Sequence, residues 1–464
     1  MSGRAHLQQI QTRSDRLSVR NGRLLISEQD AGDLLRRFGS PLFVVVEATL
    51  RQNYRRLRDA FAPRWPGPLS VLYAVKANNT LAILAALRDE GAGADCFGPG
   101  ELHACLQAGM DPACMVMNGS NKGDAELAAA VAHGICINID SEDEIAAIGR
   151  LALPSDRVRV NVRLKPMPPA IDGYSAAFFK SAGGMLDAVR RTKWGFSVDA
   201  AASLVRRILV SPRLELCGFS AHVGRFAESP DAFAIIAEQI GRDVRRLYDE
   251  TGFWPSVLDI GGGWPRQREP ESRSAAMNPN PIEAYAKAAC AALLDGLAPG
   301  PKPPPALWLE PGRYLVGNAV LLLATVGTTK RDLGHAWMNV DASTNWLMRV
   351  ETSSAWHHIL PATLMDAPCD QTVDVVGNTC IPSLLGAGRS LPILPPGEAI
   401  AVLDTGMYAE VLGNQFNALT RPATIMLSGA EAHVIRRRET IADVFALHQV
   451  PPHLAPATRT ESAA

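Results

Sequence analysis

Several features that would assign a protein to a specialised class are missing from this sequence. The 464 residues carry a formal net charge of only −1, which gives no electrostatic basis for binding nucleic acid or a membrane surface. The N-terminus has no apolar core of a signal peptide, and the longest apolar run, residues 315–326, is too short to span a bilayer. The eight cysteines form no CxxC pair and no zinc-like spacing. We therefore expect a soluble, cytoplasmic protein of two or three domains, with reduced thiols and no metal.

Between residues 69 and 310, short apolar segments alternate with helical patterns such as TLAILAALRDEG and PGELHACLQAG. Eight strands in a segment of roughly 240 residues are the number expected of a (β/α)8 barrel. Two long connections, 165–198 and 264–281, interrupt the rhythm and are candidates for functional loops. The predicted strands are 69–75, 93–97, 115–119, 135–140, 158–164, 216–223, 257–262 and 306–310.

After the eighth strand, the pattern changes to strand-like segments with few helices between them, which predicts a second, mostly β domain. Near the N-terminus, SVRNGRLLI predicts a hairpin that turns at Asn21-Gly22, and Ser27 with Asp30 predicts the start of a helix ending near Phe38. We expect this N-terminal segment to complete the β domain. The predicted domains are residues 1–45 (N-terminal hairpin and helix), 46–315 (barrel), 316–450 (β domain) and 451–464 (disordered tail).

The functional groups of such a barrel lie where its strands end, on the loops that follow. Each candidate here has an ordinary explanation when taken alone: a surface lysine, a helix-capping aspartate, a core histidine or a glycine turn. Because the candidates stand at several strand ends that meet at one mouth, a common site is favoured. They are Lys76 after the first strand, Asp95 after the second, His222 after the sixth, Gly261, Gly262 and Gly263 after the seventh, and Glu310 with Arg313 after the eighth.

These groups suit a phosphorylated aromatic aldehyde. Successive glycines let backbone N–H groups approach an anion, and Arg313 adds a permanent positive charge. The Lys76 amine can form a Schiff base with a carbonyl, and the Glu310 carboxylate can hold a pyridine nitrogen protonated. The ring of His222 can stack on an aromatic cofactor. Phosphate, aldehyde and pyridine together indicate pyridoxal 5′-phosphate (PLP).

The motifs YAVKAN, HVG, DIGGGWP, EPGR, GNTC and DTGMYAEVLGNQFN occur in this order. On these motifs, the chain from about residue 40 to residue 447 resembles the fold III PLP-dependent decarboxylases, which include diaminopimelate and ornithine decarboxylases. The resemblance implies that Lys76 is the Schiff-base lysine, that His222 stacks on the cofactor and that Glu310 pairs with the pyridine nitrogen. It also implies a phosphate site formed by Gly261 to Gly263, Arg313 and Tyr408, with Asp95 and Arg225 as further cofactor-site residues.

The same resemblance implies a homodimer with shared active sites, in which Cys380 reaches the partner's site as a proton donor. The alternative for Cys380 is a buried structural thiol. The expected reaction is decarboxylation of an L- or meso-amino acid, or of an amino-acid conjugate, to CO2 and an amine in amino-acid or specialised-metabolite biosynthesis. The cofactor ring would delocalise the resulting negative charge, and the thiol of Cys380 would protonate it.

Departures from the family's pattern bear on the substrate. Ile381 and Pro382 stand where relatives that act on diamino acids have an acidic residue, and Arg225 stands where a serine is usual. The segment after Asp341 adds three basic side chains, Arg349, His357 and His358. One interpretation is a pocket of positive charge, in which lysine, ornithine and diaminopimelate are poorer substrates than an amino acid with a distal carboxylate or an acidic conjugate. The other is that Arg225 only replaces serine at the phosphate and that the histidines lie on the surface.

Three other functions remain open on the sequence alone. A barrel racemase also uses a PLP-bound lysine, but such enzymes place an arginine at the pyridine nitrogen, where this chain has Glu310. A catalytically inactive, decarboxylase-like regulatory protein is disfavoured because Lys76, Glu310 and Cys380 are retained. A sugar-phosphate barrel enzyme would explain the glycines and EPGR, but not the β domain or YAVKAN.

Overall fold

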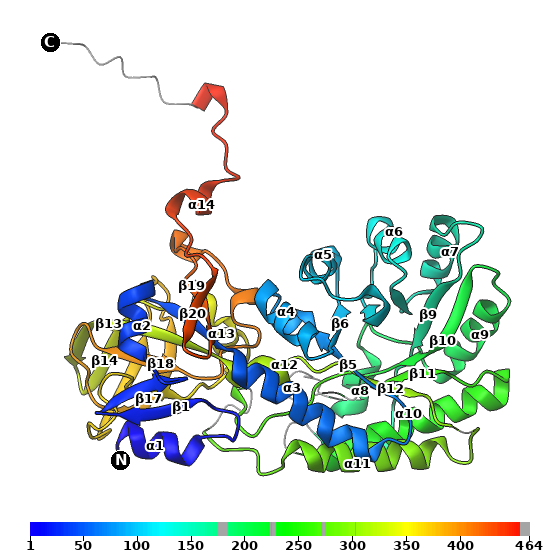
Figure 1. The fold of residues 1–464 in the computed structure, drawn as a ribbon, viewed down its shortest axis with the longest axis horizontal. Coiled ribbons are helices and arrows are strands. Elements are labelled where there is room, and N and C mark those ends of the chain that lie inside the picture. Colours follow the sequence, from blue (N-terminus) through cyan, green and yellow to red (C-terminus); the bar gives the residue numbers. More distant parts are fainter. Residues whose placement is uncertain (175–182, 223, 225–228, 271–274, 302, 455–464) are drawn as a thin grey trace.

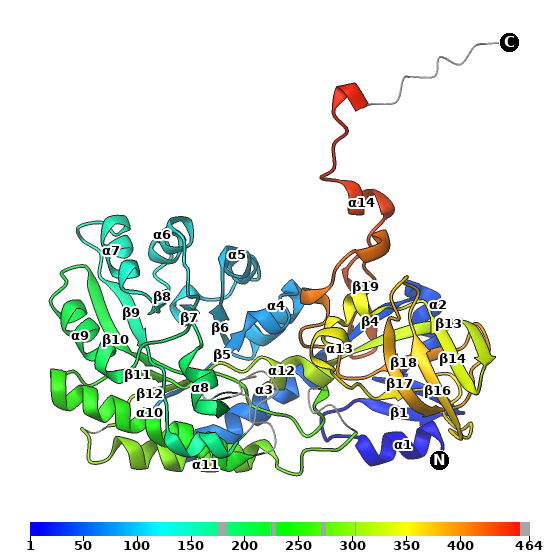
Figure 2. The same ribbon diagram turned by 180° about the vertical axis from the view of Figure 1, so that it is seen from behind.

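The structure is a computed structural model that describes residues 1–174, 183–222, 224, 229–270, 275–301 and 303–454. Figures 1 and 2 show a helix-covered barrel beside a mostly β domain, with the C-terminal segment extending away from both. The predicted fold class is therefore confirmed. Most of the predicted disordered tail, residues 455–464, lies outside the described residues. Within the described part of the chain, no helix is both long and apolar enough to cross a membrane.

All eight predicted barrel strands form, and each pairs in parallel with its neighbours to close the barrel. These strands appear in the sequence as apolar runs because parallel strands inside a ring of helices are covered on both faces. Their bounds are β5 (Leu69–Ala74), β6 (Gly93–Cys96), β7 (Met115–Met117), β8 (Cys136–Ile139), β9 (Val158–Arg163), β10 (Leu214–Ser220), β11 (Val257–Asp259) and β12 (Ala306–Leu309).

Nine helices surround the described part of the barrel. In the longest, the Ser229 hydroxyl accepts a hydrogen bond from the N–H of Ala232, and Gly252 ends the helix at φ 72°. The helices are α3 (Glu47–Phe61), α4 (Leu81–Asp89), α5 (Pro99–Gln107), α6 (Asp124–Ala132), α7 (Glu142–Leu151), α8 (Gly184–Arg190), α9 (Val198–Leu209), α10 (Pro230–Thr251) and α11 (Ile282–Leu297).

The β domain contains a sheet in the order β17-β16-β14-β13-β4-β19-β20, with β18 and β15 on a branch from β13. The N-terminal segment supplies β4, which pairs antiparallel with β13 and parallel with β19. The strands are β4 (Leu42–Val46), β13 (Val320–Asp332), β14 (His335–Val340), β15 (Ile359–Leu360), β16 (Gln371–Val376), β17 (Leu384–Leu391), β18 (Ala399–Val402), β19 (Ala423–Ser428) and β20 (Glu431–Arg436).

Strand β4 is buried on both faces and separates two cores. Phe43 and Val45 pack into the core shared with the barrel, whereas Leu42, Val44 and Val46 pack against the N-terminal segment. This alternation is the period of two that a strand imposes on its side chains. The N-terminal segment is thus an integral part of the β domain.

The N-terminal hairpin confirms one local prediction and corrects another. Strands β1 (Leu17–Arg20) and β2 (Arg23–Ile26) turn at Asn21 and Gly22, whose φ angles of 50° and 74° fit a type I′ turn. Helix α2 (Ala31–Phe38), however, is capped by Asp30, whose carboxylate accepts a hydrogen bond from the N–H of Asp33 at 3.0 Å. The predicted start near Ser27 was wrong because residues 29 and 30 pair with β2 as a short third strand.

A buried ionic cluster joins the barrel, the β domain and the N-terminal segment. Arg268, on the connection after β11, donates to Asp15 at 2.8 Å and to Asp404 at 3.0 Å. Its guanidinium also donates to the carbonyl of Ile10 at 2.8 Å. We call Arg268, Asp15 and Asp404 the junction cluster. Because Asp404 begins the loop that leads to Tyr408, the cluster anchors one side of the candidate active site.

Candidate active site

Lys76 lies at the mouth of the barrel, in the single 3-10 turn that follows β5. Its Nζ donates to Asp95 Oδ2 at 2.5 Å, and its side chain retains 35% exposure where it borders a cavity. The protein desolvates the ammonium group, but the carboxylates of Asp95 and Glu310 outweigh this effect and raise the pKa of Lys76. Asp95 is fully buried as the partner of Lys76, and α5 is capped by Gly98, so Asp95 does not cap that helix.

Glu310 follows β12 and lies within a group of carboxyls. Burial, reinforced by the charge of Asp95, raises the pKa of Glu310 to about 6, although Lys76 opposes this shift. Asp259, at the end of β11, shares a hydrogen bond with Glu310, and burial followed by the charge of Glu310 raises the pKa of Asp259. The site therefore holds more acidic groups than the single ammonium of Lys76 can balance.

His222 lies at the barrel mouth, as the sequence predicted, and it lies against the glycine turn. Its Nδ1 accepts a hydrogen bond from the N–H of Gly224 at 3.0 Å, and the ring borders the same cavity as Lys76. Gly261 and Gly263 adopt φ angles of 73° and 92°, which strongly favour glycine. A Cβ on Gly262 would lie 2.1 Å from the carbonyl oxygen of Glu310. Close backbone packing is thus one reason for the three glycines, in addition to the predicted contact with phosphate.

Arg313 and Tyr408 approach the site from different segments. Arg313 is buried at the start of α12 (Arg313–Val316), where its Nη1 lies 3.3 Å from Oε2 of Glu269. The backbone N–H of Tyr408 donates to the carbonyl of Ala77 at 2.8 Å, which places Tyr408 next to the lysine turn. Both residues are therefore held close to the barrel mouth by tertiary contacts.

The cavity at this mouth has a volume of about 280 Å3, which suits one small aromatic ligand. Lys76, His222 and Glu310 contribute to its wall. Arg163 and Lys165, at and after the end of β9, add two further cations, and Trp194 adds a ring that lies 5.8 Å from the guanidinium carbon of Arg163. The long connection 165–198 thus supplies part of the cavity, although its residues 175–182 are outside the described ranges.

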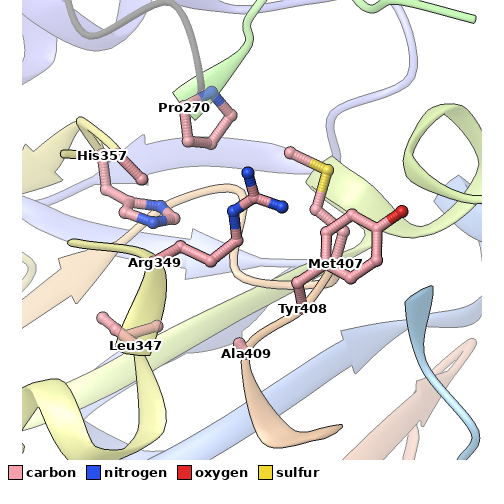
Figure 3. A pocket seen from close by; sticks show the side chains of 8 residues that line it. Pro270, Leu347, Arg349, His357, Met407, Tyr408 and Ala409 are labelled. Carbon is pink, nitrogen blue, oxygen red and sulfur yellow. The ribbon is translucent and has the colours of Figure 1, made fainter. Parts of the chain in front are cut away.

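A second, much smaller cavity of about 10 Å3 lies beside Tyr408 (Figure 3). The guanidinium of Arg349, from α13 (Met348–Ser353), lies 5.0 Å from the centre of the Tyr408 ring. His357 also borders this cavity, and its Nδ1 is 2.8 Å from the carbonyl oxygen of Leu403. A pocket of this size holds no more than about one water molecule.

The predicted positive charge of the two histidines is not supported. Both are buried, and burial lowers the pKa of His357 and lowers that of His358 to about 3. They are consequently neutral near pH 7, and His358 pairs with the ring of His6 at 3.0 Å. Both alternatives considered for the histidines were wrong, since these residues are neither cationic nor on the surface. Of the three basic residues in this segment, only Arg349 adds positive charge.

One predicted site residue, Cys380, is not brought to the cavity, and another lies outside the described residues. Cys380 is exposed on the loop between β16 and β17, where its N–H donates to Asn417 Oδ1 at 3.0 Å, so it is not a buried structural thiol. Arg225 lies outside the described residues. Asp341, which precedes the basic segment, accepts a hydrogen bond from the N–H of Thr325 at 2.9 Å.

The structure also adds side chains that the sequence reasoning missed. The most direct contact is made by Asn118, whose Nδ2 lies 2.7 Å from Asp95 Oδ1 and 2.7 Å from Glu310 Oε1. Asp259, Glu269 and Arg163 complete the surroundings of the predicted residues. A signal was present, because asparagine is disfavoured in strands, yet MVMN, CINID and VRVNV place one at each of three apolar strands.

Comparison with known proteins defines the class to which this site belongs. A family model described as "Pyridoxal-dependent decarboxylase, pyridoxal binding domain" matches residues 47–317. The chain belongs to this family of PLP-dependent decarboxylases. It is 33% identical over 435 residues to the diaminopimelate decarboxylase of Methanothermobacter thermautotrophicus, covering 93% of this chain and 97% of that one. For the diaminopimelate decarboxylase of Vibrio cholerae, identity is 30% over 434 residues, with coverage of 93% and 98%.

Solved structures agree with this assignment. The crystal structure of diaminopimelate decarboxylase from M. jannaschii superposes with a TM-score of 0.85 at 27% identity, covering 95% of this chain and 99% of that one. The protein is accordingly a PLP-dependent amino-acid decarboxylase of amino-acid biosynthesis. The racemase, the inactive regulatory protein and the sugar-phosphate enzyme are set aside.

The residues present fit PLP. A lysine amine, an imidazole ring and a carboxylate border one cavity, and the excess of acidic groups around Glu310 suits a positively charged pyridinium. When bound, PLP supplies an electron sink for the charge left by the departing CO2. The residues that would hold PLP are Lys76, which is fixed against Asp95, and Glu310 and His222, which border the same cavity.

Proposed function

We propose that Lys76 carries PLP as a Schiff base and that Glu310 faces its pyridine nitrogen. The observation that carries this assignment is the placement of Lys76 and Glu310 on one cavity, where the charges of Asp95 and Glu310 both raise the pKa of Lys76. His222 and the three glycines form the proposed stacking ring and phosphate turn, and Arg313, Arg225 and Tyr408 are the further phosphate residues. The amine of Lys76 can form the Schiff base, and the carboxylate of Glu310 can hold the pyridine nitrogen protonated.

We further propose that the substrate is an amino acid with a distal carboxylate. Arg163 and Lys165 border the cavity next to Lys76, and Arg349 lies over Tyr408 at the smaller cavity. The relatives are named diaminopimelate decarboxylases, and diaminopimelate carries a carboxylate on its far carbon as well as an ammonium group. The sequence predicted that diaminopimelate is a poor substrate, but the relatives' names favour the opposite, so we take meso-diaminopimelate as the first candidate to test. Lysine and ornithine stay as expected poor substrates.

A competition experiment tests the substrate class. The holoenzyme is incubated with meso-diaminopimelate, lysine, ornithine, acidic amino acids and their acidic conjugates, and loss of CO2 is followed by mass spectrometry. Substrates with a distal carboxylate should dominate, and Arg349→Met should raise KM for them more than it lowers kcat. Arg389→Met is the matched control, since Arg389 is also stacked on a ring, 3.7 Å from the centre of Trp356. Efficient turnover of lysine or ornithine would contradict the proposal.

We also propose that the enzyme is a homodimer whose active sites are shared. The contact between Cys380 and Asn417 brings Ile381 and Phe416 to one region of surface, where both are exposed. The segment from α14 (Ile441–Phe445) onward extends away from the body in Figures 1 and 2, and its Ile441, Phe445 and Leu447 are exposed at 63%, 47% and 95%. Exposed apolar groups of this kind favour burial against a second copy of the chain.

Subunit mixing tests the shared site. Lys76→Ala and Cys380→Ala should each be nearly inactive alone. After exchange of subunits, about a quarter of the sites should be intact, because half of the dimers are mixed and each mixed dimer has one complete site. No recovery despite demonstrated exchange would place both residues in the same chain's site. Deleting the residues after Glu439 should weaken the dimer, which sedimentation at several concentrations would measure.

A further inference from the structure

Three buried asparagines form a hydrogen-bonded chain that ends on the two carboxylates of the active site. Asn161 Nδ2 donates to Asn138 Oδ1 at 3.0 Å, and Asn138 Nδ2 donates to Asn118 Oδ1 at 2.8 Å. Asn118 Nδ2 then reaches both Asp95 Oδ1 and Glu310 Oε1 at 2.7 Å. All three are at most 4% exposed. We call Asn118, Asn138 and Asn161 the asparagine ladder.

Strand geometry explains why the ladder exists. Asn138 and Asn161 are register partners on β8 and β9, and Asn118 directly follows β7, the next strand of the barrel. Register partners on neighbouring parallel strands project from the same face of the sheet. Three asparagines at neighbouring strand positions can therefore link side by side, at right angles to the chain direction. None of these links connects residues that are close in sequence.

The carboxylates determine which way every amide points. An ionised carboxylate only accepts hydrogen bonds, so Asn118 must present its NH2 group to Asp95 and Glu310. Its oxygen is then free to accept from Asn138, whose own oxygen accepts from Asn161. Asn161 Oδ1 has no hydrogen-bond partner among the described residues, so the ladder ends there. The direction of all three amides is thus set at the active-site end.

Asn118 also counteracts the repulsion between the two carboxylates. Asp95 is 0% exposed and Glu310 is 7% exposed, and the charge of Asp95 contributes to the raised pKa of Glu310. Two N–H bonds from one amide favour the ionised form of both groups. Without them, one carboxylate would take up a proton more readily, and a neutral Glu310 could not hold a pyridine nitrogen protonated.

We propose that Asn118 is a positioning residue of the decarboxylase, which aims Asp95 at Lys76 and Glu310 at the cofactor, and that Asn138 and Asn161 hold its amide in the required direction. The proposal rests on the roles proposed above for Lys76 and Glu310. Asn118 acts through these two carboxylates, and the ladder extends the site sideways across the ends of β7, β8 and β9.

The test follows cofactor binding across pH. The dissociation constant of PLP is measured from pH 5 to pH 8 for the wild type and for Asn118→Leu, which removes both donors at nearly constant volume. Loss of the two bonds raises the pKa of the carboxyl pair, so the pH below which PLP binding weakens should move up by about one unit. At pH 6 the affinity should fall about fivefold, since a rise of about one unit in a pKa of about 6 lowers the ionised fraction from about one half to about one tenth.

Two further variants separate positioning from stability. Asn138→Leu keeps the donors of Asn118 but removes the bond that orients them, so a smaller shift of the same sign is expected. Asn53→Leu is the control, because Asn53 is equally buried and bonds Leu315 O at 2.8 Å and Asn318 Oδ1 at 2.9 Å, away from the site. It should lower the melting temperature and leave the pH dependence of PLP binding unchanged. If Asn118→Leu does not fold, Asn138→Leu decides the question.

The result that would overturn the proposal is a folded Asn118→Leu, or Asn138→Leu in its place, with unchanged PLP binding across pH. Combination with Glu310→Gln shows whether the effect passes through Glu310, because the shift caused by Asn118→Leu should largely disappear when Glu310 has no charge to titrate. If Glu310→Gln alone leaves the pH dependence intact, the role of Glu310 is wrong. If Glu310→Gln removes it and Asn118→Leu does not move it, only the ladder proposal is wrong.

Discussion

The junction cluster and the group of Lys76, Asp95 and Glu310 have similar composition, one cation with two carboxylates, but they differ in how their charges are balanced. In the junction cluster, Arg268 is 3% exposed and is bound by Asp15 and Asp404. Burial opposes ionisation of Asp15, but the charge of Arg268 outweighs it and lowers the pKa of Asp15. At the barrel mouth, burial and a neighbouring carboxylate instead raise the pKa of Glu310 to about 6.

The balance of charge distinguishes a cluster that stabilises the fold from one that can bind a charged ligand. A guanidinium with several fixed partners satisfies both aspartates of the junction cluster and closes it to solvent. The single ammonium of Lys76 serves Asp95 directly, borders a cavity and leaves Glu310 with unfavourable negative charge. A pyridinium would supply the missing positive charge. Raised carboxyl pKa values next to a cavity are therefore the better indicator of the active site.

Removing the cation Lys76 from the active site should have the largest effect on activity. Lys76→Ala should abolish measurable turnover yet leave a folded protein, and borohydride reduction of the wild-type holoenzyme should fix a pyridoxyl group on Lys76. Peptide mapping by mass spectrometry measures the label. Lys165→Ala is the matched control, because Lys165 borders the same cavity and burial lowers its pKa. A pyridoxyl label on Lys165 would show that Lys165, and not Lys76, forms the Schiff base.

Removing the cation from the junction cluster should affect stability instead. Arg268→Met leaves Asp15 and Asp404 buried without a partner, and we expect a loss of about 3–5 kcal/mol in the free energy of unfolding. Urea denaturation measures it. Arg20→Met is the control, since Arg20 and Glu28 form an exposed ion pair that contributes at most about 1 kcal/mol. Equal effects from the two variants would show that the junction cluster is not a structural anchor.

Neutralising Glu310 should lower the rate more than it affects folding. Glu310→Gln should still bind PLP but reduce kcat about a hundredfold, or about 3 kcal/mol, because an amide stabilises a pyridinium poorly. Steady-state kinetics, with chemistry shown to be rate-limiting, provides the measurement. Asp243→Asn is the control, because Asp243 is also a buried carboxyl with a pKa raised to about 6, but it lies on the outer helix α10. An unchanged rate in Glu310→Gln would reject the role.

The smallest expected effect concerns the cofactor-free protein. Since the pKa of Glu310 rises from 4.5 to about 6 on folding, the native state is penalised as the group ionises. Below about pH 4.5, Glu310 is mainly protonated in both states and the penalty is absent; above about pH 6 it is fully present. Glu310→Gln should therefore gain about 2 kcal/mol relative to the wild type between pH 4 and pH 7. Asp243→Asn should gain similarly without losing activity, and a constant difference across pH would contradict the assignment.

The local patterns allowed much of the fold to be predicted. Continuous apolar segments identified all eight barrel strands, because strands buried on both faces have little freedom to carry polar residues. Asn21-Gly22 identified a turn, since few other pairs accept two positive φ angles. The helix start near Ser27 was misplaced because pairing of residues 29 and 30 with β2 is a tertiary event that the local signal does not contain.

For the site, the sequence by itself determined which residue types stand at the strand ends: Lys76, Asp95, His222, the three glycines and Glu310. It could do so because barrel topology brings every strand's C-terminal end to one mouth. Only the tertiary structure decided their protonation and support, including the neutral state of His357 and His358, the exposure of Cys380 and the asparagine ladder. These properties depend on burial and on partners from distant segments, and no pattern of neighbouring residues specifies either.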